Sequence, residues 1–295
     1  MHTNPAAARA GTEREESRPA VTAVVCTRNR PEFLPEALQG LAVRLRPDDE
    51  LVVVESGDSR GAEALRALDS DVRIVHLRSE IPGKSHKLNR AIAVARGEVV
   101  MITDDDARVD AGWVDAMAAP FQDPRVGIAF GPVEGLTHHG DEPLPALRPG
   151  EAPLLTWLYA HGVAMGVRVV AARHVGGFDE RLGPGAPAHG EEHDLLIRLW
   201  ERGWHAVIAD APPVAHLDWR NPEEERTNLL VYERGGGALL GAALRRHPIR
   251  WARLAALRGR YQLETMRSSP MGWATVRAFV GGLVYGLRLD ERRWL

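Results

Sequence analysis

The sequence predicts an α/β protein with a doubly wound, mostly parallel sheet flanked by helices. Short apolar runs of strand length alternate with stretches whose apolar residues recur at helical spacing. Continuous apolar runs are typical of buried parallel strands, and their alternation with helices favours a sheet covered on both faces. Hydrophobic residues make up 44% and charged residues 26% of the 295 residues, a composition that excludes disordered, collagenous and multi-span membrane chains.

The first half of the chain carries the clearest pattern. Four strands are predicted, at Val21–Cys26, Leu51–Val54, Val72–Leu77 and Val99–Thr103. The helices predicted between them are Phe33–Leu45, Gly61–Leu68 and Lys84–Ala95. Ligands of such sheets bind at the carboxyl ends of the strands, so we expect the chemistry just after these four strands.

The second half is less regular. A strand is predicted at Val126–Phe130, a long surface loop at residues 137–153, and a return to the sheet within Gly162–Ala172. Glu191–Arg202 has the spacing of a helix that stops at Gly203, and the chain from Asn221 onward is helical and basic. The predicted domains are a disordered tail (1–20), a catalytic domain (21–220) and a C-terminal helical extension (221–295).

Cysteine use and hydropathy favour a cytoplasmic protein. The single cysteine, Cys26, excludes an intramolecular disulfide and a Cys-rich metal site, and its apolar neighbours predict a buried structural thiol. Residues 1–20 lack the apolar core of a secretory signal. The uncharged stretch Ala278–Leu287 is ten residues long, about half of the ~20 that a spanning helix needs.

Basic charge is concentrated near the C-terminus. The segment from Leu244 to Arg293 contains eleven arginines and three acidic residues, so its net charge is +8 in a chain whose total is −3. One interpretation is an interfacial helix with an apolar stripe, in peripheral contact with an anionic membrane such as the inner face of the cell membrane. The stripe would consist of Trp251, Leu254, Leu257 and Tyr261. The other is that these helices pack on the catalytic domain with solvated arginines. A nucleic-acid partner is not expected, because the segment carries no recognition motif.

Two acidic groups and one histidine are candidates for chemistry. Asp104-Asp105-Asp106 follows an apolar strand, where burial without a partner would be unfavourable, so either a divalent cation or solvent must satisfy it. In Glu191-Glu192-His193-Asp194 the carboxylates either cap a helix or include a proton acceptor, Glu192. His216 is either structural or a metal ligand.

The order of these residues resembles the inverting family 2 glycosyltransferases, which have the GT-A fold. The resemblance covers about Val21–Trp219 and has six parts. They are Thr27-Arg28-Asn29-Arg30-Pro31 after the first strand, Val52-Val53-Val54-Glu55-Ser56-Gly57, Gly83-Lys84-Ser85-His86-Lys87-Leu88-Asn89, the DxD-like Asp104-Asp105-Asp106, Gly176-Gly177-Phe178-Asp179-Glu180, and Gly190-Glu191-Glu192-His193-Asp194-Leu195. Any one of them alone would be weak evidence, and their shared order makes the resemblance specific.

The resemblance implies a role for each site residue. Binding of the nucleotide-sugar would fall to Thr27, Arg28, Glu55, Lys84, Asp104 and Asp105. Asp106 and His216 would hold a divalent metal, Mn²⁺ or Mg²⁺. Glu192 would be the catalytic base, and Phe178, Asp179 and Glu191 would lie on the acceptor side. The implied reaction moves a sugar from a nucleoside-diphosphate sugar to a hydroxyl of a saccharide, lipid-linked or small-molecule acceptor. The alternative is a catalytically silent module that binds nucleotide-sugars with the same fold.

Three residues depart from the family pattern, and two lysines stand out. Glu55 and Glu192 replace the usual aspartates, and Arg28 replaces an aromatic residue. Lys84 and Lys87 are the only lysines among 37 basic residues, and both fall in the predicted nucleotide-binding stretch. A compact ammonium suits a tight pocket better than a planar guanidinium does, so we expect Lys84 to contact the nucleotide and Lys87 to be solvated.

Overall fold

The structure is a computed structural model that describes residues 18–134, 160–217, 222–268 and 271–289. The chain divides into two compact units. The first contains residues 1–82, 87–177 and 198–217, and the second contains residues 83–86, 178–197 and 218–295. Among the described residues, no helix combines the length and apolar character that a membrane-spanning segment requires.

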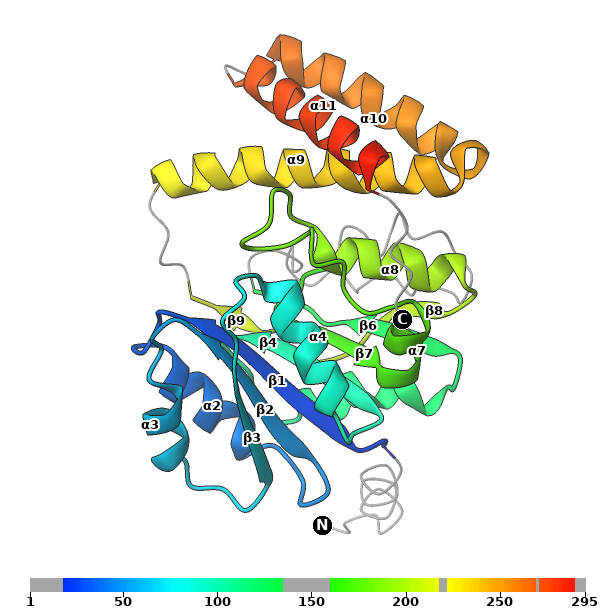
Figure 1. Cartoon of the computed structure of the whole chain (residues 1–295). Coiled ribbons are helices and arrows are strands. Elements are labelled where there is room, and N and C mark those ends of the chain that lie inside the picture. Colours follow the sequence, from blue (N-terminus) through cyan, green and yellow to red (C-terminus); the bar gives the residue numbers. More distant parts are fainter. Residues whose placement is uncertain (1–17, 135–159, 218–221, 269–270, 290–295) are drawn as a thin grey trace, which may run out of the picture. The chain divides into compact units, whose positions relative to one another are not determined.

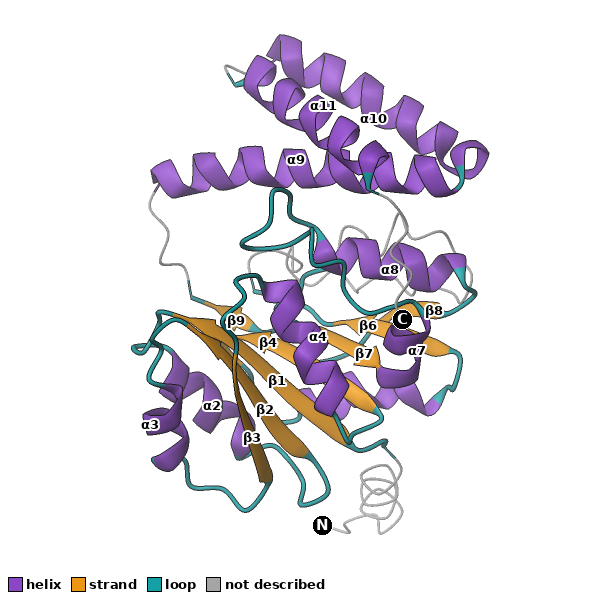
Figure 2. Cartoon of the chain, viewed as in Figure 1, coloured by secondary structure: helices purple, strands orange, loops and turns teal. Residues whose placement is uncertain are grey.

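The first unit is built on a seven-stranded, mostly parallel sheet (Figure 2). Its strands are β1 (Val21–Arg28), β2 (Glu50–Ser56), β3 (Arg73–Arg78), β4 (Val99–Asp104), β6 (Val126–Phe130), β7 (Met165–Arg168) and β8 (His205–Ile208), in the order β3-β2-β1-β4-β7-β6-β8. Only β7 runs antiparallel to its neighbours, β4 and β6. The predicted α/β class and mostly parallel sheet are confirmed.

Helices cover both faces of this sheet (Figure 1). They are α2 (Leu34–Ala42), α3 (Gly61–Arg66), α4 (Lys84–Val94), α5 (Trp113–Ala118), the 3₁₀ turn η1 (Ala119–Gln122) and α7 (Val169–His174). One core cluster joins alternate β1 residues, such as Val21 and Val25, to Leu38 of α2 and Trp113 of α5. Alternation along a strand sends neighbouring side chains to opposite faces, so β1 contributes to the core on both sides.

Sequence and structure differ at two places in the sheet. β3 lies one residue later than predicted and is an edge strand with half-exposed side chains, because it pairs with β2 alone. Gly162–Ala172 does return to the sheet, but only as β7, and helix α7 begins directly after it. The predicted loop at 137–153 and residues 1–17 lie outside the described residues. Arg18, within the predicted tail, is buried and pairs with Asp49 at 2.6 Å.

The second unit contains three long C-terminal helices, α9 (Pro222–Arg246), α10 (Pro248–Ser268) and α11 (Gly272–Arg288), together with most of α8 (Glu191–Glu201). Small residues let α9 and α11 approach closely. A Cβ atom on Gly282 would lie 1.9 Å from the carbonyl oxygen of Arg234, and one on Gly237 would lie 2.0 Å from that of Phe279. The predicted C-terminal helices are therefore confirmed, whereas the domain boundaries at residues 20 and 220 stay a prediction.

Candidate active site

A pairing of two short strands brings His216 beside the acidic segment. β5 (Ala107–Arg108) pairs antiparallel with β9 (Ala215–His216), which sets Ala107 opposite His216. The Leu217 amide also donates a hydrogen bond to the carbonyl of Asp106 at 3.0 Å. As a result, His216 Nε2 lies 3.4 Å from Asp106 Oδ1.

Three side chains in this region are close enough to bind one ion. A carboxylate oxygen of Asp104, one of Asp106 and a ring nitrogen of His216 all lie within 4.8 Å of one another. Asp106 is almost fully buried, and a buried carboxylate needs nearby positive charge. Two carboxylate oxygens and one imidazole nitrogen suit Mn²⁺ and can also serve Mg²⁺. The donor set therefore fits the predicted metal, with Asp104 added to the two predicted ligands.

Asp105 points to different partners. Thr27 Oγ1 donates to Asp105 Oδ2 at 2.6 Å, and Arg30 Nη1 donates to Asp105 Oδ1 at 2.8 Å. The same nitrogen of Arg30 donates to Asp106 Oδ2 at 2.8 Å. Burial raises the pKa of Asp105, and the contacts with Thr27 and Arg30 only partly oppose it. Arg30 and Thr27 thus hold the acidic segment at the ends of β1 and β4.

Glu55 supports a loop through its buried carboxylate. Oε1 accepts hydrogen bonds from the backbone amides of Ser59 and Gly61, at 2.8 and 3.2 Å, and Oε2 lies 2.9 Å from His76 Nε2. Burial tends to raise the pKa of Glu55, but the two amides and His76 lower it overall. Ser59 Oγ in turn lies within hydrogen-bond distance of Thr27 Oγ1, at 2.9 Å. The predicted nucleotide contact Glu55 therefore also organises residues 59–61.

The turn after β1 places Arg28 at the surface. Arg28 is exposed at the end of β1, and the next residue, Asn29, has a φ of +54°. Asn29 Oδ1 accepts a hydrogen bond from the Asp58 amide at 2.8 Å. Gly57 has a φ of +69°, and a Cβ atom there would lie 2.1 Å from Asn29 Oδ1, so glycine is required.

The expectation that Lys87 is solvated is wrong. Lys87 is 5% exposed, and its Nζ donates to the carbonyl of Thr27 at 2.9 Å and to Ser56 Oγ at 3.3 Å. Thr27 and Ser56 lie at the carboxyl ends of β1 and β2. Lys87 therefore ties these two strand ends together from α4, a role that the sequence pattern could not distinguish from that of Lys84.

The second unit contains the predicted catalytic base. Glu192 Oε1 lies 3.1 Å from His193 Nδ1. Burial would raise the pKa of Glu192, but His193 and Lys84 more than offset this effect and lower it. Burial and the neighbouring Glu192 together raise the pKa of Glu191, and Lys84 only partly opposes them. Of the two carboxyl groups, Glu192 is therefore the one held ionised and able to accept a proton, while Glu191 holds a proton more readily.

The other predicted acceptor-side residues are engaged within the second unit. Phe178 is fully buried. Arg181 Nε and Nη2 donate to the two carboxylate oxygens of Asp179 at 2.8 and 2.7 Å. Tyr285 of α11 donates its hydroxyl to the carbonyl of Arg181 at 3.1 Å. These contacts fix the turn at 178–182 rather than leaving its side chains in solvent.

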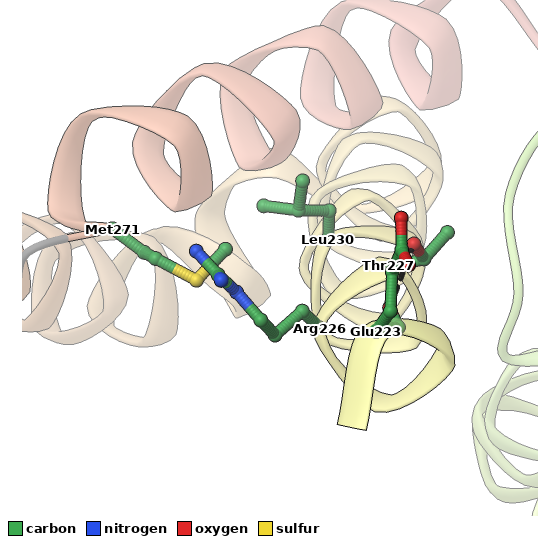
Figure 3. A pocket seen from close by; sticks show the side chains of 5 residues that line it. All are labelled: Glu223, Arg226, Thr227, Leu230 and Met271. Carbon is green, nitrogen blue, oxygen red and sulfur yellow. Dashed lines mark hydrogen bonds between the residues drawn. The ribbon is translucent and has the colours of Figure 1, made fainter. Parts of the chain in front are cut away.

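A separate hollow of about 480 Å³ lies where α9 begins (Figure 3). Its lining residues are Glu223, Arg226, Thr227, Leu230 and Met271. None of the residues predicted for the active site lines it, so it is distinct from the groups described above.

Comparison with known protein families identifies the family of the domain that carries the Asp104–Asp106 segment. A family model described as glycosyl transferase family 2 matches residues 22–160, which include β1 to β4 and the Asp104–Asp106 segment. Residues 22–160 are a glycosyl transferase family 2 domain. The resemblance inferred from the six sequence motifs is thereby confirmed.

Curated relatives of the family 2 domain are glycosyltransferases. A pre-mycofactocin glycosyltransferase from Mycobacterium tuberculosis is 28% identical over 284 residues, which cover 91% of this chain and 57% of the relative. This chain therefore spans little more than half the length of that relative. A glucosyl-dolichyl phosphate glucuronosyltransferase from Haloferax volcanii is 24% identical over 115 residues, covering 38% of this chain and 37% of the relative.

Solved structures share the fold of the family 2 domain and the helices after it. A mannosyltransferase from Pyrobaculum calidifontis, solved with GDP-Man and Mn²⁺, has a TM-score of 0.58 at 20% identity and covers 92% of this chain and 88% of its own. Residues 1–349 of S. aureus TarS have a TM-score of 0.58 at 14% identity, with 91% and 81% covered. The predicted GT-A fold is confirmed.

Four residues around the site were not predicted to act there. Arg30 was quoted within the first motif but given no role, and His76, His193 and Lys87 were not assigned to the site. His76 stands between apolar Val75 and Leu77 in the predicted third strand, which is a usable signal for a polar partner. Lys87 acquires its contacts only from the tertiary fold, so local pattern could not reveal them, whereas His193 contacts Glu192, the residue before it in the sequence.

Proposed function

We propose that the chain is a metal-dependent inverting glycosyltransferase that moves a sugar from a nucleoside-diphosphate sugar to an acceptor hydroxyl. The observation that carries this proposal is the group formed by Asp104, Asp106 and His216 at the end of β4, within a family 2 domain. The glycosyltransferase names of the curated relatives support the reaction class. The acceptor hydroxyl would belong to a saccharide, a lipid-linked molecule or a small molecule.

Donor binding is assigned to the carboxyl ends of β1, β2 and β4. Asp106 and His216, joined by Asp104, would hold the cation, for which Mn²⁺ or Mg²⁺ is proposed. When bound, the cation would neutralise charge on the diphosphate and stabilise it as a leaving group. Thr27, Arg28 and Asp105 would contact the nucleotide, and Glu55 would act through the 59–61 loop that it organises. A mannosyltransferase of the same fold, solved with GDP-Man and Mn²⁺, supports this assignment.

Proton transfer is assigned to the second unit. The acceptor oxygen attacks the anomeric carbon while the bond from that carbon to the diphosphate oxygen breaks. Glu192, held ionised by His193 and Lys84, takes the hydroxyl proton as the new bond forms. The nucleoside diphosphate leaves with the bonding electron pair. A single displacement inverts the anomeric centre and leaves no sugar on the enzyme. Phe178, Asp179 and Glu191 are proposed to shape the acceptor side.

The proposal is tested in two steps. UDP, GDP and dTDP are first screened by thermal shift with and without Mn²⁺, and the sugar donors of the nucleotide that binds are then assayed for transfer. Glu192→Gln should lower transfer by at least about a hundredfold, within the range for loss of a general base, with an unchanged nucleotide Kd. Glu63→Gln, which makes the same change at an exposed position of α3 in the first unit, is the matched control.

Each outcome has a distinct meaning. Turnover retained by Glu192→Gln would overturn the assignment of the base. Nucleotide binding without transfer to any offered acceptor would favour the silent binding module. The failure of every nucleoside diphosphate to bind with Mn²⁺ would overturn the donor assignment. The proposal also includes the cytoplasmic location expected from the single cysteine. Peripheral membrane contact is a separate question, which depends on residues of the C-terminal helices.

A further inference from the structure

Helix α11 buries its glycines and exposes its large apolar side chains. Gly282 and Gly286 lie against the backbone of α9, where a Cβ atom on either would come within 1.9 Å of a carbonyl oxygen. The large apolar residues that are exposed lie on the face away from α9. They are Trp273, Val280, Val284 and Leu287, with exposed fractions of 72, 48, 41 and 45%. A water-facing helix surface normally carries polar residues, so this face is suited to an apolar environment.

The neighbouring helix α10 exposes a row of positive charge in addition to the apolar residues Ile249, Leu257, Tyr261 and Leu263. Arg253, Arg260 and Arg267 recur every seven residues and are all exposed, which places them in one row along the helix. On the described parts of α10 and α11, six exposed arginines (250, 253, 260, 267, 277 and 288) accompany one exposed acidic residue, Glu264. α10 packs against α11, so the basic row and the apolar face lie on adjacent helices.

The apolar stripe predicted from the sequence for α10 is only half exposed. Trp251 is 4% exposed and Leu254 is half-buried, whereas Leu257 and Tyr261 are each 49% exposed. Arg258 also turns inward, where Nη2 donates to Glu233 Oε2 at 2.8 Å. The first half of that stripe is therefore helix-packing surface, its second half is exposed, and α11 carries a further exposed apolar face.

We propose that the outer faces of α10 and α11 form a docking surface for an anionic lipid bilayer. The arginine row of α10 would lie at the headgroups and attract acidic lipids. The apolar face of α11 would enter the interface, with Trp273, at the start of the helix, at the depth that tryptophan favours. Arg277 and Arg288 flank this face and can extend their charged ends back toward the headgroups.

A second copy of the chain and a nucleic acid each fit this surface less well. In a symmetric dimer formed through this surface, the arginines of one copy would face those of the other without matching carboxylates. A nucleic acid would pair with the arginine row but would leave the α11 face of Trp273, Val280, Val284 and Leu287 in water. An anionic bilayer matches both features, because it presents negative headgroups over an apolar interior.

Vesicle flotation of the full chain tests the proposal. We expect recovery with vesicles of equal parts phosphatidylcholine and phosphatidylglycerol, and little recovery with phosphatidylcholine alone. Raising the salt from about 0.1 M to about 1 M shortens the screening length from ~10 Å to ~3 Å and should release much of the bound protein. Arg253→Gln, Arg260→Gln and Arg267→Gln combined should weaken binding by roughly a hundredfold, since each arginine near the surface contributes about a factor of five.

Matched variants separate charge from apolar insertion. Arg66→Gln, Arg96→Gln and Arg202→Gln remove the same charge from exposed positions of the first unit and should leave recovery close to wild type. Val280→Ser with Val284→Ser should weaken binding at high salt as well as low salt. The control pair Val43→Ser and Val170→Ser alters two valines elsewhere that are more exposed than Val280 and Val284, and it should not weaken binding.

Several results would overturn the proposal. Equal recovery with neutral and anionic vesicles would show that the arginines do not contribute to binding. Equal losses of binding for the two triple-arginine variants would show that only the net charge of the protein matters, and not the arginine row of α10. A concentration-dependent dimer abolished by Val280→Ser with Val284→Ser would assign the surface to a second copy. Binding of a short duplex RNA in preference to vesicles, lost in the α10 triple variant, would assign it to nucleic acid.

Discussion

A single nitrogen of Arg30 bridges the carboxylates of Asp105 and Asp106, at 2.8 Å from each. Both aspartates are buried, and Arg30 is about one-third exposed. The guanidinium therefore balances charge on the acidic segment from the side of β1, while Asp106 faces His216 through its other oxygen. Positive charge on this segment can come from Arg30, from a bound cation or from both.

Removing Arg30 should make stability depend more strongly on metal. Arg30→Gln leaves two buried carboxylates with less compensation, so we expect the free energy of unfolding to fall by about 1–3 kcal/mol without metal. Added Mn²⁺ should restore more stability in the variant than in the wild type, because the ion then supplies the missing charge. Urea unfolding with EDTA measures the free energy of unfolding without metal, and urea unfolding with Mn²⁺ measures how much stability the ion restores.

The control for Arg30 is an arginine whose ion pair is exposed. Arg108 pairs with Glu36 on the surface, where both side chains are more than half exposed. Surface pairs contribute about 0–1 kcal/mol, so Arg108→Gln should change stability little, and equally with and without Mn²⁺. An Arg30 variant that behaves like the Arg108 variant would contradict the bridging role.

The strands could be predicted from sequence far better than the contacts at their ends. β1, β2 and β4 are built around runs of buried, mostly apolar residues. Because the carboxyl ends of parallel strands meet at one edge of a sheet, Thr27, Glu55 and Asp104 are placed at that edge. The pairing of β5 with β9 left no pattern, because each strand has two residues. His216 was therefore placed by family resemblance, and the packing that sets it beside Asp106 came only from the structure. Buried Lys87 was missed because its partners lie on distant strands.

The metal group predicts separable effects of its ligands. His216→Ala removes the nitrogen donor and Asp106→Asn weakens an oxygen donor, so each should reduce Mn²⁺ affinity by at least about tenfold. Isothermal titration or the Mn²⁺ EPR signal measures this in the absence of any sugar donor. His205→Ala, which alters a histidine of β8 outside the group, is the control. Mn²⁺ affinities that are the same in all three variants would place the metal elsewhere.

Glu55 offers a test that distinguishes loop support from direct nucleotide contact. Glu55→Gln keeps the size of the side chain but loses the charge that the Ser59 and Gly61 amides and His76 favour, so stability should fall by about 1–3 kcal/mol at neutral pH. The pKa of Glu55 is lowered in the folded state, so its stabilising contribution is present above its ordinary value of 4.5 and is lost as the pH falls through the lowered value. The variant and wild type should therefore converge in acid. Unchanged stability at neutral pH with weaker nucleotide binding would instead indicate direct contact alone.

Substitution of Lys87 should lower stability, whereas substitution of Lys84 should weaken donor binding. Lys87→Met removes the buried ammonium that links the ends of β1 and β2, and we expect a loss of about 1–3 kcal/mol of stability because Thr27 O and Ser56 Oγ lose their donor. Lys84→Arg should leave stability nearly unchanged and weaken donor binding. Thermal unfolding and nucleotide titration of both variants measure the two effects. If Lys84→Arg binds the donor as tightly as wild type, Lys84 is not a close nucleotide contact.

Glu191 predicts a pH dependence of opposite sign to that of Glu55. Burial and the adjacent Glu192 raise the pKa of Glu191 to about 8, so ionising it is harder in the folded chain than in the unfolded one. The folded state is then progressively destabilised as the pH rises from about 4.5, the ordinary value, toward 8. Glu191→Gln removes this penalty, so its stability relative to wild type should increase across that pH range. Glu223→Gln, at an exposed position of α9, should show no such trend. A flat difference between Glu191→Gln and wild type from pH 4.5 to 8, in urea unfolding at each pH, would show that Glu191 is not the protonated member of the pair.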